Sequence, residues 1–198
     1  MSRKHILYVV LAVIVGGIIC IIFVNMFLKP PDLDRPDLDI FYKETETKSL
    51  QHPDRQVIHL YFADKDNSFL ISEERSLFLS SDPSKSGPAE SGKQIIEALI
   101  HGPEKGLMQT IPGAAKLRAL YVTQDGTAYV DLTVAVKEQH PGGVNSELLT
   151  IYSIVNSLIL NISEINAVKI LIGGSESLTL AGHIDLSSPL YANMLLIR

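Results

Sequence analysis

The chain is poor in cysteine and in clustered basic residues, and each shortage argues against a class of protein. Its single cysteine, Cys20, cannot form a disulfide within the chain, so a folded domain must be stabilised by a packed core. The 17 Lys and Arg residues are outnumbered by 22 Asp and Glu residues, and the formal net charge is −5. Nucleic-acid binding needs clustered cations that neutralise phosphates, so this composition argues against a nucleic-acid partner.

The histidines lack the spacing of a metal site. Neither H-x-x-x-H nor H-E-x-x-H occurs in the sequence, although both are common signatures of zinc enzymes. The segment Gly173–Ser177 resembles a nucleophile elbow only superficially, because a serine stands where G-x-S-x-G has its last glycine. We therefore expect no metal, no cofactor and no catalytic residue. Hydrolysis that uses His183 or Asp185 is the third of three functional hypotheses.

One long apolar run stands near the N-terminus. Residues Ile6–Val24 contain no Asp, Glu, Lys or Arg. As a helix, this run would extend about 28 Å, close to the roughly 30 Å hydrocarbon core of a bilayer. With residues 25–28 reaching the far interface, the sequence predicts a transmembrane helix over residues 6–28, preceded by a short cytoplasmic N-terminus over residues 1–5.

Processing signals favour a signal anchor that is not cleaved. No small-residue cleavage pattern follows the run, and Cys20 is preceded by Ile18 and Ile19, which is unlike a lipid-attachment site. A large C-terminal domain after a first anchor is commonly exported. We expect a single-pass protein of the cytoplasmic membrane with an extracytoplasmic C-terminal domain.

A linker and one domain follow the anchor. Residues 29–55 contain Pro30, Pro31 and Pro36 and repeat the tetrapeptide Pro-Asp-Leu-Asp, which is typical of a solvated spacer. Residues 56–198 are long enough to bury one core. The sequence therefore predicts a stalk that carries a single folded domain.

The pattern of the domain predicts an α+β fold. Alternating apolar residues, turn signals and capping signals place its elements. Strands are expected at Val57–Ala63, Leu117–Thr123, Thr127–Leu132 and Ala167–Ile172, shorter extended pieces at Phe69–Ile71 and Ser76–Leu79, and helices from a Ser91–Gln94 capping box to Gly102 and from an Asn145 N-cap to about Leu160. We expect a small mixed sheet of three to four main strands, with both helices on one face.

The second expected helix has an uncharged polar face made of Ser146, Thr150, Ser153 and Ser157. A helix that faces water normally carries charges there. Two interpretations are open. The face is buried inside the domain, which we favour, or it forms an interface with another copy or another protein.

Several short motifs resemble the GerMN domain of sporulation and spore-germination proteins. The motifs are Glu97–Pro103, Ile111–Pro112, Val130–Leu132, Gly182–Leu186 and Pro189–Leu190, and the similarity spans about residues 57–198. The resemblance implies a non-enzymatic domain outside the cytoplasmic membrane that is similar to the ring-building modules of envelope assemblies. It implies structural roles for Gly102, Pro103, Pro112, Asp131, Gly182, His183, Asp185 and Pro189.

We expect the rings of His101 and His183 to hold loop backbone.

Protein association is the leading functional hypothesis. The domain would bind other envelope proteins or itself, through a sheet edge or through the uncharged helix. The alternative is a binding module for cell-wall glycan or peptide, suggested by tyrosines that we expect to be exposed, among them Tyr121, Tyr129 and Tyr191.

Overall fold

The computed structural model describes residues 55–78 and 87–198. These residues belong to one compact unit that begins at His52 and ends at Arg198. The predicted membrane anchor, residues 6–28, and nearly all of the predicted linker lie outside the described residues. Among the helices that the structure does describe, none has both the length and the apolar character needed to cross a bilayer.

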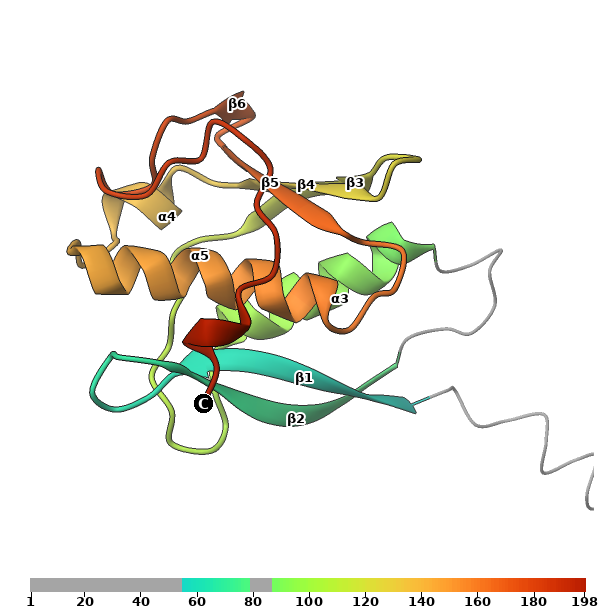
Figure 1. The fold of residues 1–198 in the computed structure, drawn as a ribbon, viewed down its shortest axis with the longest axis horizontal. Coiled ribbons are helices and arrows are strands. Elements are labelled where there is room, and N and C mark those ends of the chain that lie inside the picture. The colour runs from blue at the N-terminus through green and yellow to red at the C-terminus, as the bar shows by residue number, and fades with distance from the viewer. Residues whose placement is uncertain (1–54, 79–86) are drawn as a thin grey trace, which may run out of the picture. The chain divides into compact units, whose positions relative to one another are not determined.

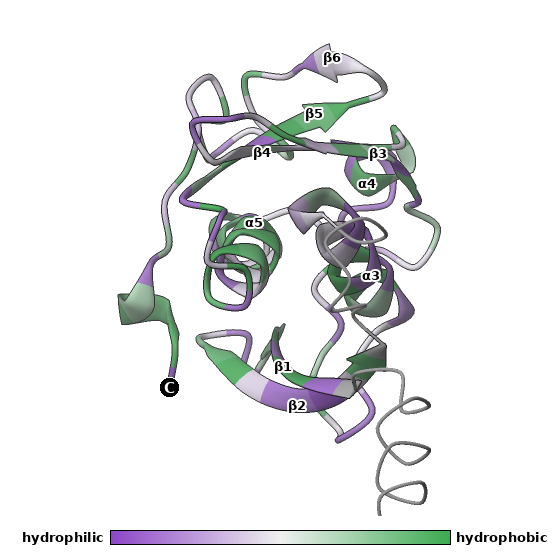
Figure 2. Ribbon diagram, turned by 90° about the vertical axis from the view of Figure 1, so that its right-hand side faces the viewer, coloured by the Kyte–Doolittle hydropathy of each residue, from purple (hydrophilic) through white to green (hydrophobic). Residues whose placement is uncertain are grey.

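Three layers make up the domain, with helices in the middle and a sheet on either side (Figures 1 and 2). One sheet is an antiparallel pair, and the other has four strands in the order β3-β4-β5-β6. The elements are β1 (Arg55–Ala63), β2 (Leu70–Phe78), α3 (Pro88–His101), β3 (Leu117–Val122), β4 (Thr127–Leu132), α4 (Ala135–Glu138), α5 (Val144–Ile159), β5 (Ala167–Ile172), β6 (Ser175–Glu176) and the 3₁₀ helix η1 (Met194–Leu196).

The α+β class is confirmed, and α3 and α5 lie on one face of the larger sheet as predicted, but the prediction of a single sheet is wrong because β1 belongs to a second, separate sheet. The two short pieces expected at residues 69–79 form the single strand β2, which pairs only with β1. Helix α5 lies against β1, and α3 contacts both β1 and β3, so each helix is covered on two sides. The β1–β2 pair stands alone as a sheet because side chains of α5 occupy the other edge of β1.

The larger sheet is mixed, as predicted. Strands β3 and β4 form an antiparallel hairpin around Asp125–Gly126, and β4 pairs in parallel with β5 after a crossover through α5. A tight Gly173–Gly174 turn then leads into β6. A parallel pair needs such a crossover connection, which the second helix provides.

Two helix starts differ from the sequence prediction. Helix α3 begins at Pro88 after Gly87, so Ser91 lies inside the first turn and forms no capping box with Gln94. Proline suits the first helical position because its missing N–H is not needed there. Helix α5 begins at Val144 after Gly143, so Asn145 is not its N-cap. The short helix α4 was not predicted.

The end of α3 is confirmed. Gly102 has a φ of 96°, and its N–H donates to the carbonyl oxygens of Ala98 and Leu99.

The hydrophobic core lies between the layers, where alternate residues of β1 and β4 meet apolar faces of α3 and α5. Its fully buried members include Leu60, Phe62, Ile95, Leu99, Val130, Leu132, Ile151 and Ile154.

Candidate functional site

The polar row of α5 seals the free edge of β1. Ser153 donates its hydroxyl to the carbonyl oxygen of Tyr61 at 2.6 Å, and Ser157 accepts the Tyr61 N–H at 3.1 Å. One turn further, the carboxamide of Asn161 accepts the His59 N–H at 2.8 Å and donates to the His59 carbonyl at 2.7 Å. These side chains form the hydrogen bonds that a neighbouring strand would otherwise form with β1. They therefore protect an exposed strand edge from pairing with other chains.

The favoured burial interpretation holds for three of the four residues of this face. Thr150, Ser153 and Ser157 are at most 2% exposed. Thr150 donates to the carbonyl of Thr110, and the half-buried Ser146 accepts a hydrogen bond from Asn67. A second protein could reach the three buried hydroxyls only if the domain opened.

A buried carboxylate organises the loop that follows β6. Glu147 has no exposed surface. Its Oε1 accepts N–H groups of Leu180, Ala181 and Ile184 at 2.8–3.2 Å, and its Oε2 accepts the His183 N–H and contacts His183 Nδ1, both at 2.9 Å. Burial by itself raises the pKa of Glu147, but these hydrogen bonds outweigh burial and lower it. The ionised carboxylate therefore fixes an irregular segment.

Strand β5 holds the next part of the same segment. Lys169 is 3% exposed, and its ammonium donates to the carbonyl oxygens of Leu186 and Ser187. Three residues on, Leu190 exchanges two backbone hydrogen bonds of 2.8 Å with Val168. These contacts attach residues 186–190 to the edge of β5.

The last contacts hold the C-terminus. Asn156 of α5 is fully buried and exchanges two hydrogen bonds with the backbone of Asn193, at 2.9 and 3.0 Å. After η1, the N–H of Arg198 donates to the carbonyl of Leu70 in β2. Residues 180–198 are thus attached to α5, β5 and β2 in turn, and we call this stretch the clamped segment.

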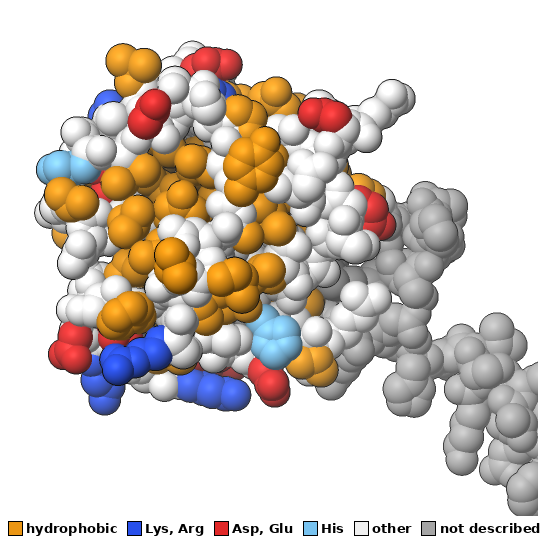
Figure 3. Space-filling view, in the orientation of Figure 1, with side chains coloured by type: hydrophobic (Ala, Val, Ile, Leu, Met, Phe, Trp, Pro, Cys, Tyr) orange, Lys and Arg blue, Asp and Glu red, His pale blue; other side chains and the backbone are white. Residues whose placement is uncertain are grey.

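The clamped segment presents apolar side chains to solvent. Tyr191 is 69% exposed, Met194 59% and Leu195 87%. Figure 3 shows hydrophobic side chains gathered across the middle of this side of the molecule, with charged side chains toward its margins. No charged residue occurs between Asp185 and Arg198. We call Tyr191, Met194 and Leu195 the apolar face.

The motif residues Gly102 and Pro103 form the turn after α3, which contacts β2. Glu73 is 1% exposed and accepts the N–H groups of Glu104 and Lys105, which follow Gly102–Pro103. Arg75 forms an ion pair with Glu73 and donates to the carbonyl of Gly102 at 2.9 Å. Glu73 and Arg75 of β2 therefore fix the position of the Gly102–Pro103 turn. Pro112 lies apart from this turn, in the wall of a cavity.

The other motif residues also anchor turns. Asp131 accepts the N–H of Gly174 at 2.8 Å and pairs with Arg118 at 3.3 Å. Asp185 accepts the N–H of Ser187. Gly182 has a φ of 106°, a conformation that glycine adopts without strain, and Pro189 directly precedes the Leu190 bridge.

The histidines do not act as expected. The ring of His183 contacts the carboxylate of Glu147 rather than loop backbone, and His101 is exposed at the end of α3 with no side-chain hydrogen bond to other described residues. Ser177 follows a β-hairpin and donates to the Thr179 carbonyl, so it does not stand on a strand-to-helix turn. Within residues 55–78 and 87–198, no three metal-binding side chains form a group that could hold an ion.

Of the three tyrosines expected to be exposed, Tyr121 and Tyr191 are exposed and Tyr129 is half-buried. Tyr121 and Tyr129 are cross-strand partners in the β3–β4 hairpin, and Tyr121 is 64% exposed. Tyr191 belongs to the apolar face. Sequence reasoning missed the anchors Asn156 and Lys169, although a lone lysine inside the apolar strand Ala167–Ile172 is a signal of a buried, paired cation.

The fold and its anchors define a small α+β module in which buried polar groups hold an irregular surface segment. Solved structures of this class exist. The tandem GerMN domains of the sporulation protein GerM from Bacillus subtilis are similar at a TM-score of 0.56 and 23% identity, over 70% of this chain and 46% of that chain. The first GerMN domain of the same protein gives 0.52 and 22%, over 70% and 98%. At these identities the likeness shows the fold.

The family follows from the sequence. The family model named Germane, described as sporulation and spore germination, matches residues 59–178, which is more than half of the chain. The chain therefore belongs to the Germane family, and its resemblance to the GerMN domain is confirmed. The match ends before the motif residues Gly182, His183, Asp185 and Pro189. A search among curated proteins found no match.

Proposed function

We propose that the chain is a non-catalytic envelope protein, anchored in the cytoplasmic membrane through residues 6–28, whose extracytoplasmic domain associates with a second copy of itself through the apolar face. The observation that carries this proposal is the exposure of Tyr191, Met194 and Leu195 on one short stretch. Contiguous exposed apolar side chains are typical of interaction sites. Tyrosine and methionine are also enriched in the cores of protein interfaces.

The anchoring of the clamped segment supports this role. Three buried polar side chains, Glu147, Asn156 and Lys169, hold the backbone on both sides of Tyr191. A surface that is already ordered loses less conformational entropy when it binds.

The domain content of a relative also supports association between copies. The Bacillus subtilis protein GerM carries GerMN domains in tandem, whereas the described residues here form one such domain. Two chains that associate would bring two domains together. This pairing fits a role in a sporulation- or germination-related envelope assembly.

Light scattering across a wide concentration range tests the proposal. Residues 52–198 form one compact unit with its own core and are suitable for the measurement. We expect the mass to rise with concentration, and Leu195→Ser or Tyr191→Ser to remove the rise. The matched control is Leu178→Ser, because Leu178 is 77% exposed but lies outside the apolar face. A constant monomer mass would contradict self-association, and equal effects of Leu178→Ser would contradict the assignment of the face.

A further inference from the structure

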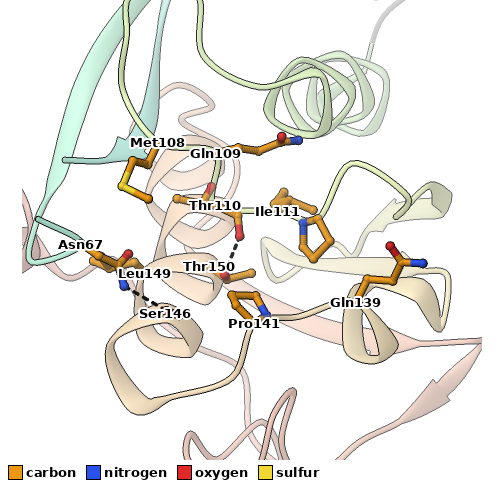
Figure 4. A pocket seen from close by; sticks show the side chains of 11 residues that line it. Asn67, Met108, Gln109, Thr110, Ile111, Gln139, Pro141, Ser146, Leu149 and Thr150 are labelled. Atoms are coloured by element: carbon orange, nitrogen blue, oxygen red, sulfur yellow. Dashed lines mark hydrogen bonds between the residues drawn. The ribbon is translucent and has the colours of Figure 1, made fainter. Parts of the chain in front are cut away.

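A cavity of about 300 Å³ opens at the end of the domain where the β1–β2 turn meets the start of α5 (Figure 4). It is lined by residues of four segments that are distant in the sequence: Asn67 in the β1–β2 turn, Met108–Pro112 before β3, Gln139 and Pro141 between α4 and α5, and Ser146, Leu149 and Thr150 in α5. None of its lining residues belongs to the apolar face, and the association proposed above does not use the cavity. Its volume is at the lower end of the range for small-molecule sites.

The lining is neutral. No Asp, Glu, Lys, Arg or His is among the residues that form the walls. Ile111, Pro112, Pro141 and Leu149 give apolar surface, while carboxamides and hydroxyls supply the polar groups. A charged ligand would find no counter-charge here, so the lining selects for an uncharged molecule with apolar parts.

Two carboxamides are available to a ligand, and Figure 4 shows them on opposite sides of the cavity. The nitrogen of Asn67 donates to Ser146, but no described residue donates to its Oδ1. The exposed Gln139 side chain forms no hydrogen bond to any described residue. A carboxamide both donates and accepts, which suits the hydroxyl and amide groups of a sugar.

Hydrogen bonds within the domain hold the walls of the cavity. Asn67 has a φ of 50° and is the one non-glycine residue with positive φ among residues 55–78 and 87–198. Its bond to Ser146 holds it in this conformation. Among the other lining residues, the Thr150 hydroxyl donates to the carbonyl of Thr110, and behind the wall it contacts the ring of His140, which does not itself line the cavity. Strained residues persist where the surrounding structure holds them, often at binding sites.

The backbone at the cavity is already paired, which argues against a peptide ligand. Extended peptides bind by adding hydrogen bonds to a strand that has a free edge. Here the N–H and carbonyl of Met108 pair with Ala63, and the carbonyl of Thr110 accepts from Thr150. The cavity therefore offers side chains rather than a strand edge.

We propose that this cavity binds one N-acetylated amino-sugar residue of a glycan. Such a sugar is neutral, its hydroxyl and amide groups can donate and accept at both carboxamides, and its methyl group matches the apolar wall. The site is independent of the apolar face.

The test is a titration of ¹⁵N-labelled residues 52–198 with a tetramer of N-acetylglucosamine, followed by NMR. We expect saturable shifts at the backbone amides of residues 108–111, 139–140 and 142–150. We also expect Gln139→Ala to weaken binding about five- to tenfold, as expected for the loss of one neutral hydrogen bond. Asn67→Gly should weaken binding similarly, because glycine tolerates the positive φ while removing the carboxamide.

Two controls make the outcome decisive. Gln124→Ala removes an exposed carboxamide in the β3–β4 turn and should leave the affinity unchanged. A glucose tetramer, which is neutral but lacks the acetamido group, should bind at least tenfold more weakly. Equal binding of the glucose tetramer, shifts confined to other residues, or binding only of an N-acetylated dipeptide amide would overturn the proposal.

Discussion

Helix α5 and the turn that follows it carry two kinds of polar side chain that bind backbone, and they serve different purposes. The row that contains Ser153, Ser157 and Asn161 is neutral and pairs with the regular edge of β1. Glu147 is charged and gathers four backbone N–H groups and a ring nitrogen from an irregular loop. A strand edge presents evenly spaced groups that short hydroxyls can reach one by one. A loop has converging N–H groups, which a carboxylate satisfies together.

The comparison predicts that the charged contact is the more costly to remove. Glu147→Gln places an amide nitrogen against N–H donors of the clamped segment. Hydrogen bonds to charged groups each contribute about 1.5–3 kcal/mol, so we expect a loss of roughly 2–4 kcal/mol in the free energy of unfolding, measured by urea denaturation. Glu138→Gln, at an exposed carboxylate of α4, is the control and should change it by less than about 0.5 kcal/mol.

The same carboxylate makes stability depend on acid pH. The pKa of Glu147 is lowered in the folded state, so its contribution is complete above the unfolded pKa of about 4.3 and is lost as the pH falls through the folded pKa. Urea unfolding at pH 7, 5, 4 and 3 should show this loss in the wild type and a smaller loss in Glu147→Gln. An identical acid dependence in both proteins would contradict this role of Glu147.

Removing one side chain of the neutral row should lower the free energy of unfolding by less than removing the charge of Glu147. Asn161→Ala removes two hydrogen bonds to His59 and leaves that part of the β1 edge unpaired. We expect a loss of about 1–2 kcal/mol in the free energy of unfolding and an increased tendency to aggregate through β1. Ser163→Ala, two residues away and exposed, is the matched control. If the two variants behave alike, the edge-sealing account is wrong.

A histidine beside the row gives a smaller, pH-dependent effect. His140 Nδ1 accepts the N–H of Gly142, so Nε2 carries the hydrogen that faces Thr150. Burial lowers the pKa of His140 in spite of the nearby charge of Glu147. The unfolded chain therefore takes up a proton first, and stability should fall as the pH drops below about 6.5. Thermal unfolding between pH 7 and 5 should show a flatter dependence in His140→Gln, and an unchanged slope would contradict it.

The apolar face should contribute least to stability. The Leu195 side chain is 87% exposed, so Leu195→Ser should change the free energy of unfolding of the monomer by less than about 0.5 kcal/mol. Urea denaturation at low concentration measures this value. A loss above about 2 kcal/mol would show that Leu195 is part of the core and would remove it from the proposed interface.

The sequence predicted local elements well and long-range pairing poorly. The alternation in Val57–Ala63, the Asp125–Gly126 hairpin and the end of α3 at Gly102 depend on neighbouring residues, and all three are confirmed. The separate β1–β2 sheet could not be foreseen, because it depends on contacts from Ser153 and Asn161 about 100 residues away.

The roles of the buried polar residues were only partly visible. The absence of charge on α5 pointed to burial, and its serines are buried. Glu147 lies in the first turn of α5, where an acidic side chain is electrostatically favourable, and this position does not reveal its contacts. Its partners lie 33–37 residues later in an irregular loop, which no periodic pattern reveals.

Hydrogen exchange of the backbone N–H groups of Leu180, Ala181, His183 and Ile184 tests the central claim most directly. Loop amides without partners exchange rapidly, whereas amides held by a buried carboxylate are protected. Our account predicts that these four amides are protected in the wild type and lose protection in Glu147→Gln while the amides of β4 and β5 keep theirs. Rapid exchange at all four positions in the wild type would contradict the account.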